Sequence, residues 1–224
     1  MRFQNRTQAG RLLAAQLASF AHQPNLRILA LPRGGVPVAF EIAQTLHAPL
    51  DVWVVRKIGA PDIPEFALGA IAPGGIGRPA IELIDEASVL HTGTTPDQLR
   101  FILDRERAEL ERREQAYRCN RPPIDIAGRA VILVDDGLAT GATMRAAIAA
   151  LRLRNPARIV VAVPVAAPSV CQRLSQEADQ VVCLFTPAWL ESVGQWYEDF
   201  SQTTDAEVCE LLRRAALSAA PHAP

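Results

Sequence analysis

The sequence is nearly without lysine: its 224 residues contain 22 arginines and one lysine, Lys57. Aromatic residues make up only 5% of the chain, and its four cysteines show neither the CxxC nor the Cys/His spacing typical of a zinc site. No stretch approaches the roughly 18 apolar residues of a membrane span, and the first residues are polar, unlike a signal peptide. These absences argue against zinc binding, disulfides and membrane insertion, and we expect a cytoplasmic protein.

The remaining composition is ordinary for an α/β protein, with 49% hydrophobic and 21% charged residues and a net charge of −1. A nearly neutral chain has no overall attraction to nucleic acid, so any anion must be bound at a local site. An ammonium group is a compact point charge and a guanidinium group a planar fork, so Lys57 in an arginine-rich chain indicates a specific requirement. A single lysine left by chance explains the composition equally well.

The most informative segment is VILVDDGLATGATM, residues 131–144. Its four aliphatic residues predict a strand buried on both faces of a parallel sheet, and Asp135 and Asp136 follow at the carboxyl end, where open α/β sheets bind ligands. Residues 137–143 then offer two glycines, two threonine hydroxyls and a helix N-terminus, a combination that cradles a phosphate. Because the lysine of a nucleotide-binding P-loop is absent, we expect the acids to accept hydrogen bonds from hydroxyl groups beside that phosphate.

This segment resembles the phosphoribosyl-pyrophosphate (PRPP) signature of the type I phosphoribosyltransferases, and its residues are most similar to those of the adenine-specific branch. The resemblance implies a doubly wound, mostly parallel α/β sheet with a Rossmann-like core, a small hood and a helical insertion. It also implies transfer of the 5-phosphoribosyl group of PRPP to a nitrogenous base, with release of pyrophosphate and with Mg²⁺ as cofactor. In that scheme Asp135 and Asp136 hold the ribose hydroxyls and reach Mg²⁺ only through PRPP. The residues implied to hold the 5′-phosphate are Gly137, Leu138, Ala139, Thr140, Gly141, Ala142 and Thr143.

A second unit of strand, loop and helix lies near the start of the chain. Residues 28–31 predict a strand, and the loop PRGG, with Arg33, Gly34 and Gly35, precedes a helix predicted over 36–46. Alone, this loop is equally consistent with an ordinary turn. Beside the signature it resembles the pyrophosphate loop of the same family, which implies a peptide bond that can turn toward the diphosphate.

Residues 52–55 predict a third strand, and prolines and a glycine interrupt the segment 56–65 that follows. This segment resembles the flexible catalytic loop of the family, which implies that Arg56 and Lys57 bind the leaving diphosphate. Glu65 is a candidate for handling the proton of the base, as in adenine-type relatives, although a solvated loop acid is equally consistent. Because crossovers are right-handed, we expect this loop at the same sheet edge as the other two.

The rest of the chain continues the alternation of helices and strands. Apolar spacing predicts a helix over 7–21, and a capping box at 95–98 opens a helix that runs to about 117. The remaining predictions are a strand at 66–72, a helix at 142–153, a strand at 159–163, a helix at 170–177 and a strand at 181–185. We expect a single domain, 1–224, with its core at about 25–72 and 123–185, a helical insertion at 74–122, a hood at 186–210 and a mobile tail at 214–224.

Residues 100–121 contain seven arginines and five acids at i,i+3 and i,i+4 separations. This pattern is typical of a solvated helix face that pairs its own charges, with a nucleic-acid-binding helix as the alternative. An apolar stripe on the same helix predicts docking onto the body or onto a second subunit. We expect a homodimer that binds PRPP and a nucleobase, without nucleic acid or membrane.

Trp196 and Tyr197 follow a Val-Gly pair in the predicted hood, where a ring could stack on a flat base. Packing within the hood is the alternative. In the hypoxanthine/guanine branch of the family, the position of Ala139 holds a third acid that serves the base proton. Its absence here favours an adenine-like or orotate-like arrangement and leaves the base unknown. The rival functions are a PRPP- or nucleotide-sensing regulator on the same fold and a sugar-phosphate enzyme such as a nucleotidase.

Overall fold

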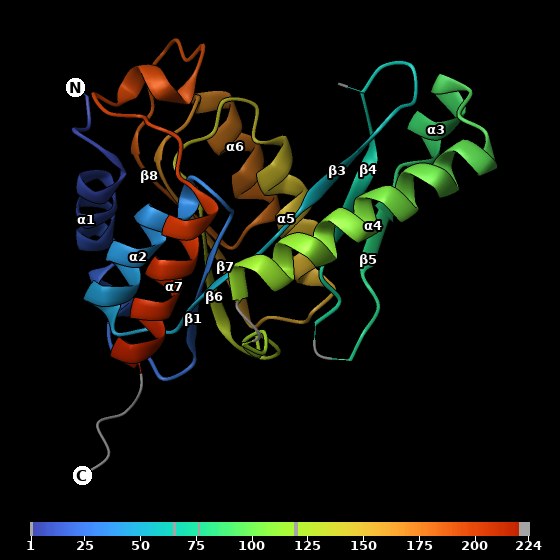
Figure 1. The fold of residues 1–224 in the computed structure, drawn as a ribbon. Coiled ribbons are helices and arrows are strands. Elements are labelled where there is room, and N and C mark those ends of the chain that lie inside the picture. Colours follow the sequence, from blue (N-terminus) through green and yellow to red (C-terminus); the bar gives the residue numbers. More distant parts are fainter. Residues whose placement is uncertain (1, 65, 76, 119–120, 220–224) are drawn as a thin grey trace.

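A five-stranded parallel sheet forms the centre of the protein in a computed structural model that describes residues 2–64, 66–75, 77–118 and 121–219 (Figure 1). The strand order is β2–β1–β6–β7–β8, and every pairing in this sheet is parallel. The chain therefore winds outward from β1 in both directions, which confirms the predicted doubly wound class. The bounds are Leu26–Ala30 for β1, Leu50–Val52 for β2, Ala130–Val134 for β6, Arg158–Val165 for β7 and Gln180–Phe185 for β8.

Helices cover both faces of this sheet (Figure 1). One face carries α1 (Arg6–Gln16), a 3₁₀ turn η1 (Ala18–Phe20), α2 (Gly35–Leu46) and α7 (Asp205–Ala219). The other face carries α5 (Ala142–Arg152) and α6 (Pro168–Glu177). The helix predicted over 7–21 is divided, because α1 ends at Gln16 and η1 follows. Residues 214–219, predicted to begin a mobile tail, instead continue α7, and residues 220–224 lie outside the described part.

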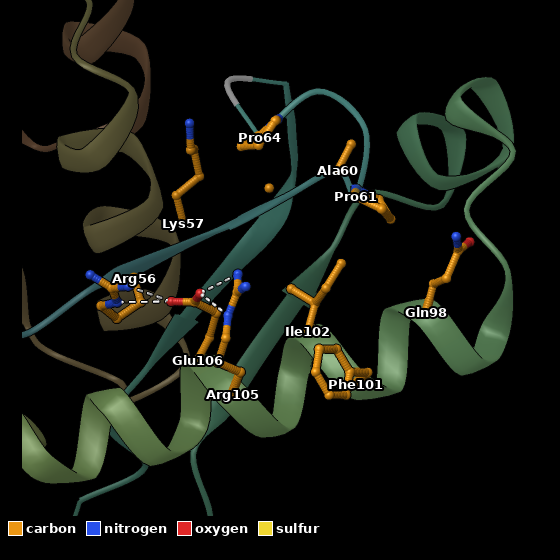
Figure 2. A pocket seen from close by; sticks show the side chains of 11 residues that line it. Arg56, Lys57, Ala60, Pro61, Pro64, Gln98, Phe101, Ile102, Arg105 and Glu106 are labelled. Atoms are coloured by element: carbon orange, nitrogen blue, oxygen red, sulfur yellow. Dashed lines mark hydrogen bonds and ion pairs between the residues drawn. The ribbon is translucent and has the colours of Figure 1, made fainter.

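A second, antiparallel sheet lies beside the first and contains β3 (Arg56–Gly59), β4 (Ala67–Ala72) and β5 (Ile81–Ile84). With α3 (Glu86–Thr92) and α4 (Pro96–Arg118) it forms a projection that we call the arm, residues 56–118 (Figure 1). Figure 2 shows α4 running along β3. The predicted helical insertion therefore also contains a strand, β5.

The prediction of a strand over 52–55 followed by an irregular loop from Arg56 is wrong. Strand β2 ends at Val52, and β3 begins at Arg56, which pairs with Ile71 of β4. Ile58 is fully buried in β3, so this short segment gains both a hydrogen-bonded partner strand and an apolar contact. The prolines that suggested a loop fall in the connection between β3 and β4, where they interrupt no strand pairing.

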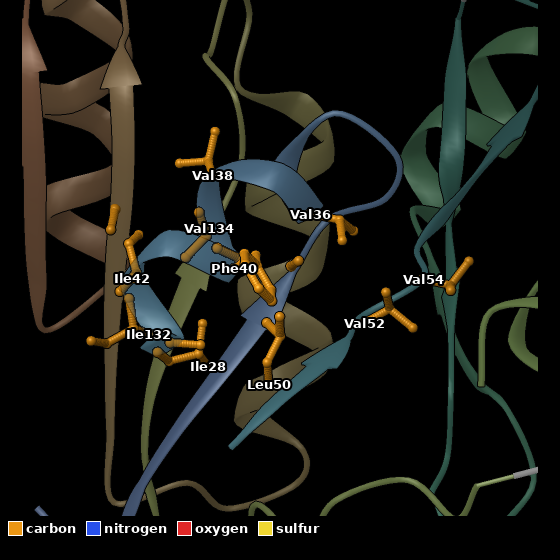
Figure 3. Packing of buried hydrophobic residues seen from close by; sticks show 14 of the residues in the cluster. Ile28, Val36, Val38, Phe40, Ile42, Leu50, Val52, Val54, Ile132 and Val134 are labelled. Atoms are coloured by element: carbon orange, nitrogen blue, oxygen red, sulfur yellow. The ribbon is translucent and has the colours of Figure 1, made fainter. Parts of the chain in front are cut away.

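The core is built from aliphatic side chains that alternate between the two faces of the parallel sheet. Ile28 and Ile132 face α2 (Figure 3). Their neighbours Leu29 and Leu133 face α5. Burial of each such side chain stabilises the fold by about 1.5–3 kcal/mol. This two-sided core fixes the carboxyl ends of β1 and β6 side by side, where the predicted loops begin.

The capping box predicted at the start of α4 is present. The Thr95 backbone N–H donates to Gln98 Oε1 at 2.9 Å, and the Gln98 N–H donates to Thr95 Oγ1 at 3.3 Å. At the other end of α4, the buried Arg118 donates to both carboxylate oxygens of the buried Asp51 at 3.2 Å. Because Asp51 belongs to β2, this ion pair fastens the arm to the edge of the central sheet.

Candidate functional site

The two loops with the strongest sequence signals contact each other at the carboxyl edge of the central sheet. Ala30 pairs with Val134 at the end of β1 and β6, so the PRGG loop and the acid pair, Asp135 and Asp136, start at the same level. A Cβ atom at Gly34 would overlap with the Asp136 carboxylate, and one at Gly35 would lie 2.7 Å from the Val134 carbonyl oxygen. Both glycines are therefore needed for the PRGG loop to close onto the acid pair.

The phosphate loop, residues 137–143, leads from the acid pair into α5. Gly141 has φ 74° and ends the loop at the N-cap position of this helix, and a Cβ there would lie 2.6 Å from Val170. The side chains of Thr140 and Thr143 are exposed. The loop is attached to the end of β7, because the Leu138 N–H donates to the Val165 carbonyl at 2.9 Å. An exposed loop with two hydroxyls and a helix N-terminus suits an anion.

The acid pair is partly withdrawn from solvent. The Asp136 backbone N–H donates to Asp135 Oδ1 at 2.9 Å. Burial, followed by the neighbouring Asp136 charge, raises the pKa of Asp135 well above its usual range. Burial also raises the pKa of Asp136, although a hydrogen bond from Arg6 opposes that shift. Two such carboxyl groups are suited to binding hydroxyl groups, which would replace the water that they have lost.

Arg6, the first residue of α1, was not predicted as part of the site. Its Nε donates to Asp136 Oδ2 at 2.7 Å, and both side chains are nearly buried. The sequence holds no signal for this contact, because Arg11 on the same helix looks equivalent and instead pairs with Glu41. The pairing arises only when α1, which packs against α2, β7 and β8, brings Arg6 to the loop that follows β6.

Two aromatic side chains predicted to bind a base are packed against protein side chains. Tyr197 is buried, its ring lies 5.4 Å from that of Phe3, and its hydroxyl donates to the Asp136 carbonyl oxygen at 2.6 Å. Trp196, in the short helix η2 (Val193–Trp196), packs on Phe185 with ring centroids 4.9 Å apart. Tyr197 thus supports the acid pair from the hood, and this role was not predicted from the sequence. We use the name hood for residues 186–204, and not for the predicted 186–210, because α7 begins at Asp205.

The cations predicted to bind the diphosphate are spread over two parts of the site. Arg33 lies in the PRGG loop and forms an ion pair of 3.5 Å with Asp205 at the start of α7. Arg56 lies in the arm, where its guanidinium group donates to the buried Glu106 of α4 at 2.6 Å (Figure 2). The structure therefore places Arg33 in the loop that contacts the acid pair, with its side chain on Asp205, and holds Arg56 against α4.

Lys57 lines two cavities, one of which is also lined by residues of the phosphate loop. It borders a cavity of about 510 Å³ between β3 and α4, and in Figure 2 it points away from the Arg56–Glu106 pair. It also borders a second cavity of about 430 Å³, which is lined on the other side by Ala142 and Thr143. Glu65, the predicted base-proton residue, lies outside the described residues.

The charges of α4 pair mainly with one another, as the sequence predicted. Arg112 and Arg113 both donate to Glu109 at 2.7 Å, and Arg100 pairs with Asp97 at 3.1 Å. Cations that are already paired are less available to a nucleic-acid backbone.

Within the described residues, no group of three or more His, Cys, Asp or Glu side chains is placed to hold a metal ion. In the same part of the chain, none of the helices combines the length and the hydrophobicity that a membrane span requires.

The fold and its loops define a protein with a phosphoribosyl transferase domain. The family model described as "Phosphoribosyl transferase domain" matches residues 3–189, and the chain therefore belongs to this family.

Three known proteins illustrate the similarity. The chain is 43% identical over 213 residues to "Putative phosphoribosyl transferase Rv0571c" of Mycobacterium tuberculosis, covering 95% of this chain and 47% of that protein. It is also 42% identical over 90 residues to "Bifunctional protein PyrR" of Chloroflexus aurantiacus, covering 39% of this chain and 50% of that protein. The crystal structure of TT1426 from Thermus thermophilus matches with a TM-score of 0.82 and 42% identity, covering 96% of this chain and 99% of that one. The chain spans about half the length of the curated relatives it matches.

Proposed function

We propose that this protein transfers the 5-phosphoribosyl group of PRPP to the nitrogen of a nucleobase, forming a nucleoside monophosphate and releasing pyrophosphate. The observation that carries the proposal is the direct contact between the PRGG loop and the acid pair. A PRPP molecule has a 5′-phosphate, a vicinal diol and a diphosphate in that order. The phosphate loop, the acid pair and the PRGG loop follow one another around the same sheet edge, so each group meets a loop of matching chemistry.

In this proposal the phosphate loop binds the 5′-phosphate through its backbone N–H groups and through Thr140 and Thr143. Asp135 and Asp136 accept hydrogen bonds from the ribose 2′- and 3′-hydroxyls. The PRGG loop and Arg33 bind the diphosphate, and Lys57 reaches it from the arm, because the cavity it borders is also lined by Thr143. Arg56 joins Lys57 once its pair with Glu106 opens.

The proposed transition state resembles an oxocarbenium ion, in which the bond from C1 to the diphosphate breaks before the bond to the base nitrogen is complete. The protein holds the two reacting groups in line and stabilises the charge that accumulates on the diphosphate. Mg²⁺ would share that charge. The acid pair offers the carboxylate oxygens that Mg²⁺ prefers, and two acids on one loop fit a cation that is held mainly by the oxygens of PRPP.

The base proton must be handled outside the signature, because Ala139 occupies the position of the third acid. Glu65 remains the proposed residue for this step. For the base itself we propose a place beside the hood at Trp196, whose indole Nε1 is buried without a hydrogen-bond partner among the described residues. Tyr197 acts in this proposal through the loop that it supports. The proposed partners are PRPP and a nucleobase. We propose that the protein is a cytoplasmic homodimer, and its mass can be measured by sedimentation equilibrium.

The test is incubation with PRPP, Mg²⁺ and a panel of purine and pyrimidine bases, with pyrophosphate release as the readout. We expect release with one class of base, and we expect calorimetry to detect PRPP binding without any base. Tight PRPP binding without release for every base would replace the transferase with a PRPP-sensing regulator. Absence of PRPP binding would overturn both functions.

A further inference from the structure

Arg6 makes three contacts that link separate parts of the site. Its Nε donates to Asp136 Oδ2 at 2.7 Å, and its Nη1 donates to the Ser201 carbonyl oxygen at 2.7 Å. Its guanidinium carbon lies 3.9 Å from the centre of the Phe200 ring, a cation–π contact. One nearly buried side chain therefore joins α1, the hood and the acid pair.

The backbone around Arg6 fixes where its side chain can go. The Phe3 N–H donates to the Trp196 carbonyl at 2.8 Å, and the Glu198 N–H donates to the Phe3 carbonyl at 2.8 Å. Residues 2–4 are thus attached to the hood along their length, and α1 begins directly after them. The Tyr197 hydroxyl, donating to the Asp136 carbonyl, holds the backbone of the same residue whose side chain Arg6 holds.

The position of Asp136 Oδ2 explains what this pairing does. That oxygen lies between Arg6 and Gly34, and any side chain at Gly34 would displace it. With Oδ2 held by Arg6, the plane of the Asp136 carboxylate is set, and with it the direction in which the carboxylate meets an incoming hydroxyl. The cation also offsets the repulsion between the acid pair and the phosphates of a bound substrate.

We propose that Arg6 is a positioning residue, which orients the Asp136 carboxylate for the ribose hydroxyl and couples that orientation to the hood. This inference rests on the proposed function, since it assigns a role within the PRPP site. The opposite role is also chemically defined: Arg6 would compete with the ribose hydroxyl for Asp136 and weaken substrate binding. The two roles predict opposite changes in PRPP affinity when Arg6 is replaced.

The experiment compares Arg6→Gln with Arg2→Gln. Arg2 is the matched control, because its Nε also donates to a hood carbonyl, that of Gln195, at 2.7 Å, and it does so away from the acid pair. PRPP affinity is measured by calorimetry with Mg²⁺ and no base. We expect Arg6→Gln to weaken binding by about 10-fold or more, the effect of losing a hydrogen bond to a charged group. We expect Arg2→Gln to stay within about 2-fold of wild type.

Three further measurements separate positioning from a general structural role. Arg6→Lys keeps the charge without the fork and should recover part of the loss. In the Asp136→Asn background, Arg6→Gln should cause little further loss, because the two residues act as one unit. In the steady state, the KM for PRPP should rise while the KM for the base stays unchanged. If Arg6→Gln does not fold, Phe200→Leu removes the ring beneath the guanidinium group and should weaken PRPP binding by about 3-fold.

Unchanged or tighter PRPP binding by a folded Arg6→Gln protein would overturn the proposal, as would an equal loss in Arg2→Gln. So would a loss that adds fully to that of Asp136→Asn. Failure of the proposed function looks different: PRPP binding without pyrophosphate release would overturn the transferase and leave this test of Arg6 intact, whereas a wild-type protein that binds no PRPP would remove the site altogether. In that case the role of Arg6 fails together with the function.

Discussion

The loop after β6 and strand β3 both carry residues implied to bind PRPP, yet the structure prepares them differently. The acid pair is held by the ends of two parallel strands, by Arg6 and by the hydroxyl of Tyr197. Arg56, in contrast, lies on the separate sheet of the arm, and its guanidinium group is bound to Glu106. One side of the site is already shaped for a ligand, and the other must first release an internal ion pair.

This difference indicates a division of labour within the site. In the proposed reaction, the acid pair would hold the ribose and so fix the reacting carbon, which favours catalysis through orientation. The arm would exchange Glu106 for the diphosphate and make its contribution only after the substrate has bound. We therefore expect the acid pair to dominate PRPP binding and the arm to affect mainly the leaving diphosphate.

The largest expected effect is the loss of PRPP binding when both acids are replaced. Asp135→Asn with Asp136→Asn should weaken PRPP binding by at least about 100-fold, because two hydrogen bonds to charged acceptors are lost. The arm counterpart, Arg56→Gln with Lys57→Gln, should cost only about 10-fold. Calorimetry on both double variants tests the ranking. A larger loss in the arm variant would show that the arm, and not the acid pair, dominates PRPP binding.

Gly34→Ala should have the next largest effect. The added methyl group overlaps with the Asp136 carboxylate, so either the PRGG loop or the acid must move. We expect PRPP binding to weaken by about 10-fold and stability to fall by about 1–3 kcal/mol. Gly93→Ala is the control, since Gly93 lies in the arm with open space around it and φ 64°. It should lose stability without losing PRPP affinity, and an equal loss of affinity in both variants would contradict the steric explanation.

Most of the central fold could be predicted from the sequence, because the residues of a strand there indicate by themselves where the strand lies in the sheet. Residues 131–134 are aliphatic on both faces, and only a strand in the middle of a sheet buries both faces. The PRGG loop and the acid pair were placed together by a rule of topology, which the pairing of β1 with β6 satisfies. The chemistry of these loops is contained in contiguous residues.

The arm and the Arg6 contact could not be predicted in the same way. Strand β3 is only four residues long and is stabilised by pairing with β4 and by burial of Ile58, neither of which is visible in its local composition. The partners of Arg56 and Asp136 lie 50 and 130 positions away along the chain. Such contacts are set by tertiary packing, and an arginine-rich sequence offers many equivalent candidates for each.

Glu106→Gln tests whether the ion pair in the arm restrains Arg56. Loss of the Glu106 charge weakens its hold on Arg56, so pyrophosphate should bind about 3-fold more tightly, measured by competition with PRPP. The buried pair is also disturbed, and we expect the Tm to fall by a few degrees. Glu109→Gln is the matched control, because Glu109 forms more exposed ion pairs on the same helix and should change stability by less than about 1 kcal/mol. Weaker pyrophosphate binding in Glu106→Gln would show that Glu106 positions Arg56 and does not restrain it.

The smallest expected effect is a pH-dependent change in the stability of the ligand-free protein, with opposite signs in the two regions. The pKa of Asp135 is raised by burial above its unfolded value of about 4, so wild-type stability falls as the pH rises from that value through the folded pKa. Asp135→Asn removes this loss and should raise the Tm by a few degrees at pH 7, with no gain near pH 4.

In the arm, hydrogen bonds from Ser88 lower the pKa of Asp85, the N-cap residue of α3. Its contribution is therefore present above the unfolded pKa and is lost as the pH falls through the folded pKa. Asp85→Asn should lower the Tm at pH 7 and have little effect at acidic pH, because asparagine still caps the helix. Melting curves of both variants between about pH 3 and pH 7 measure the two slopes. If stability changes with pH in the same direction in both regions, the pKa of Asp135 is not raised by folding in the ligand-free protein.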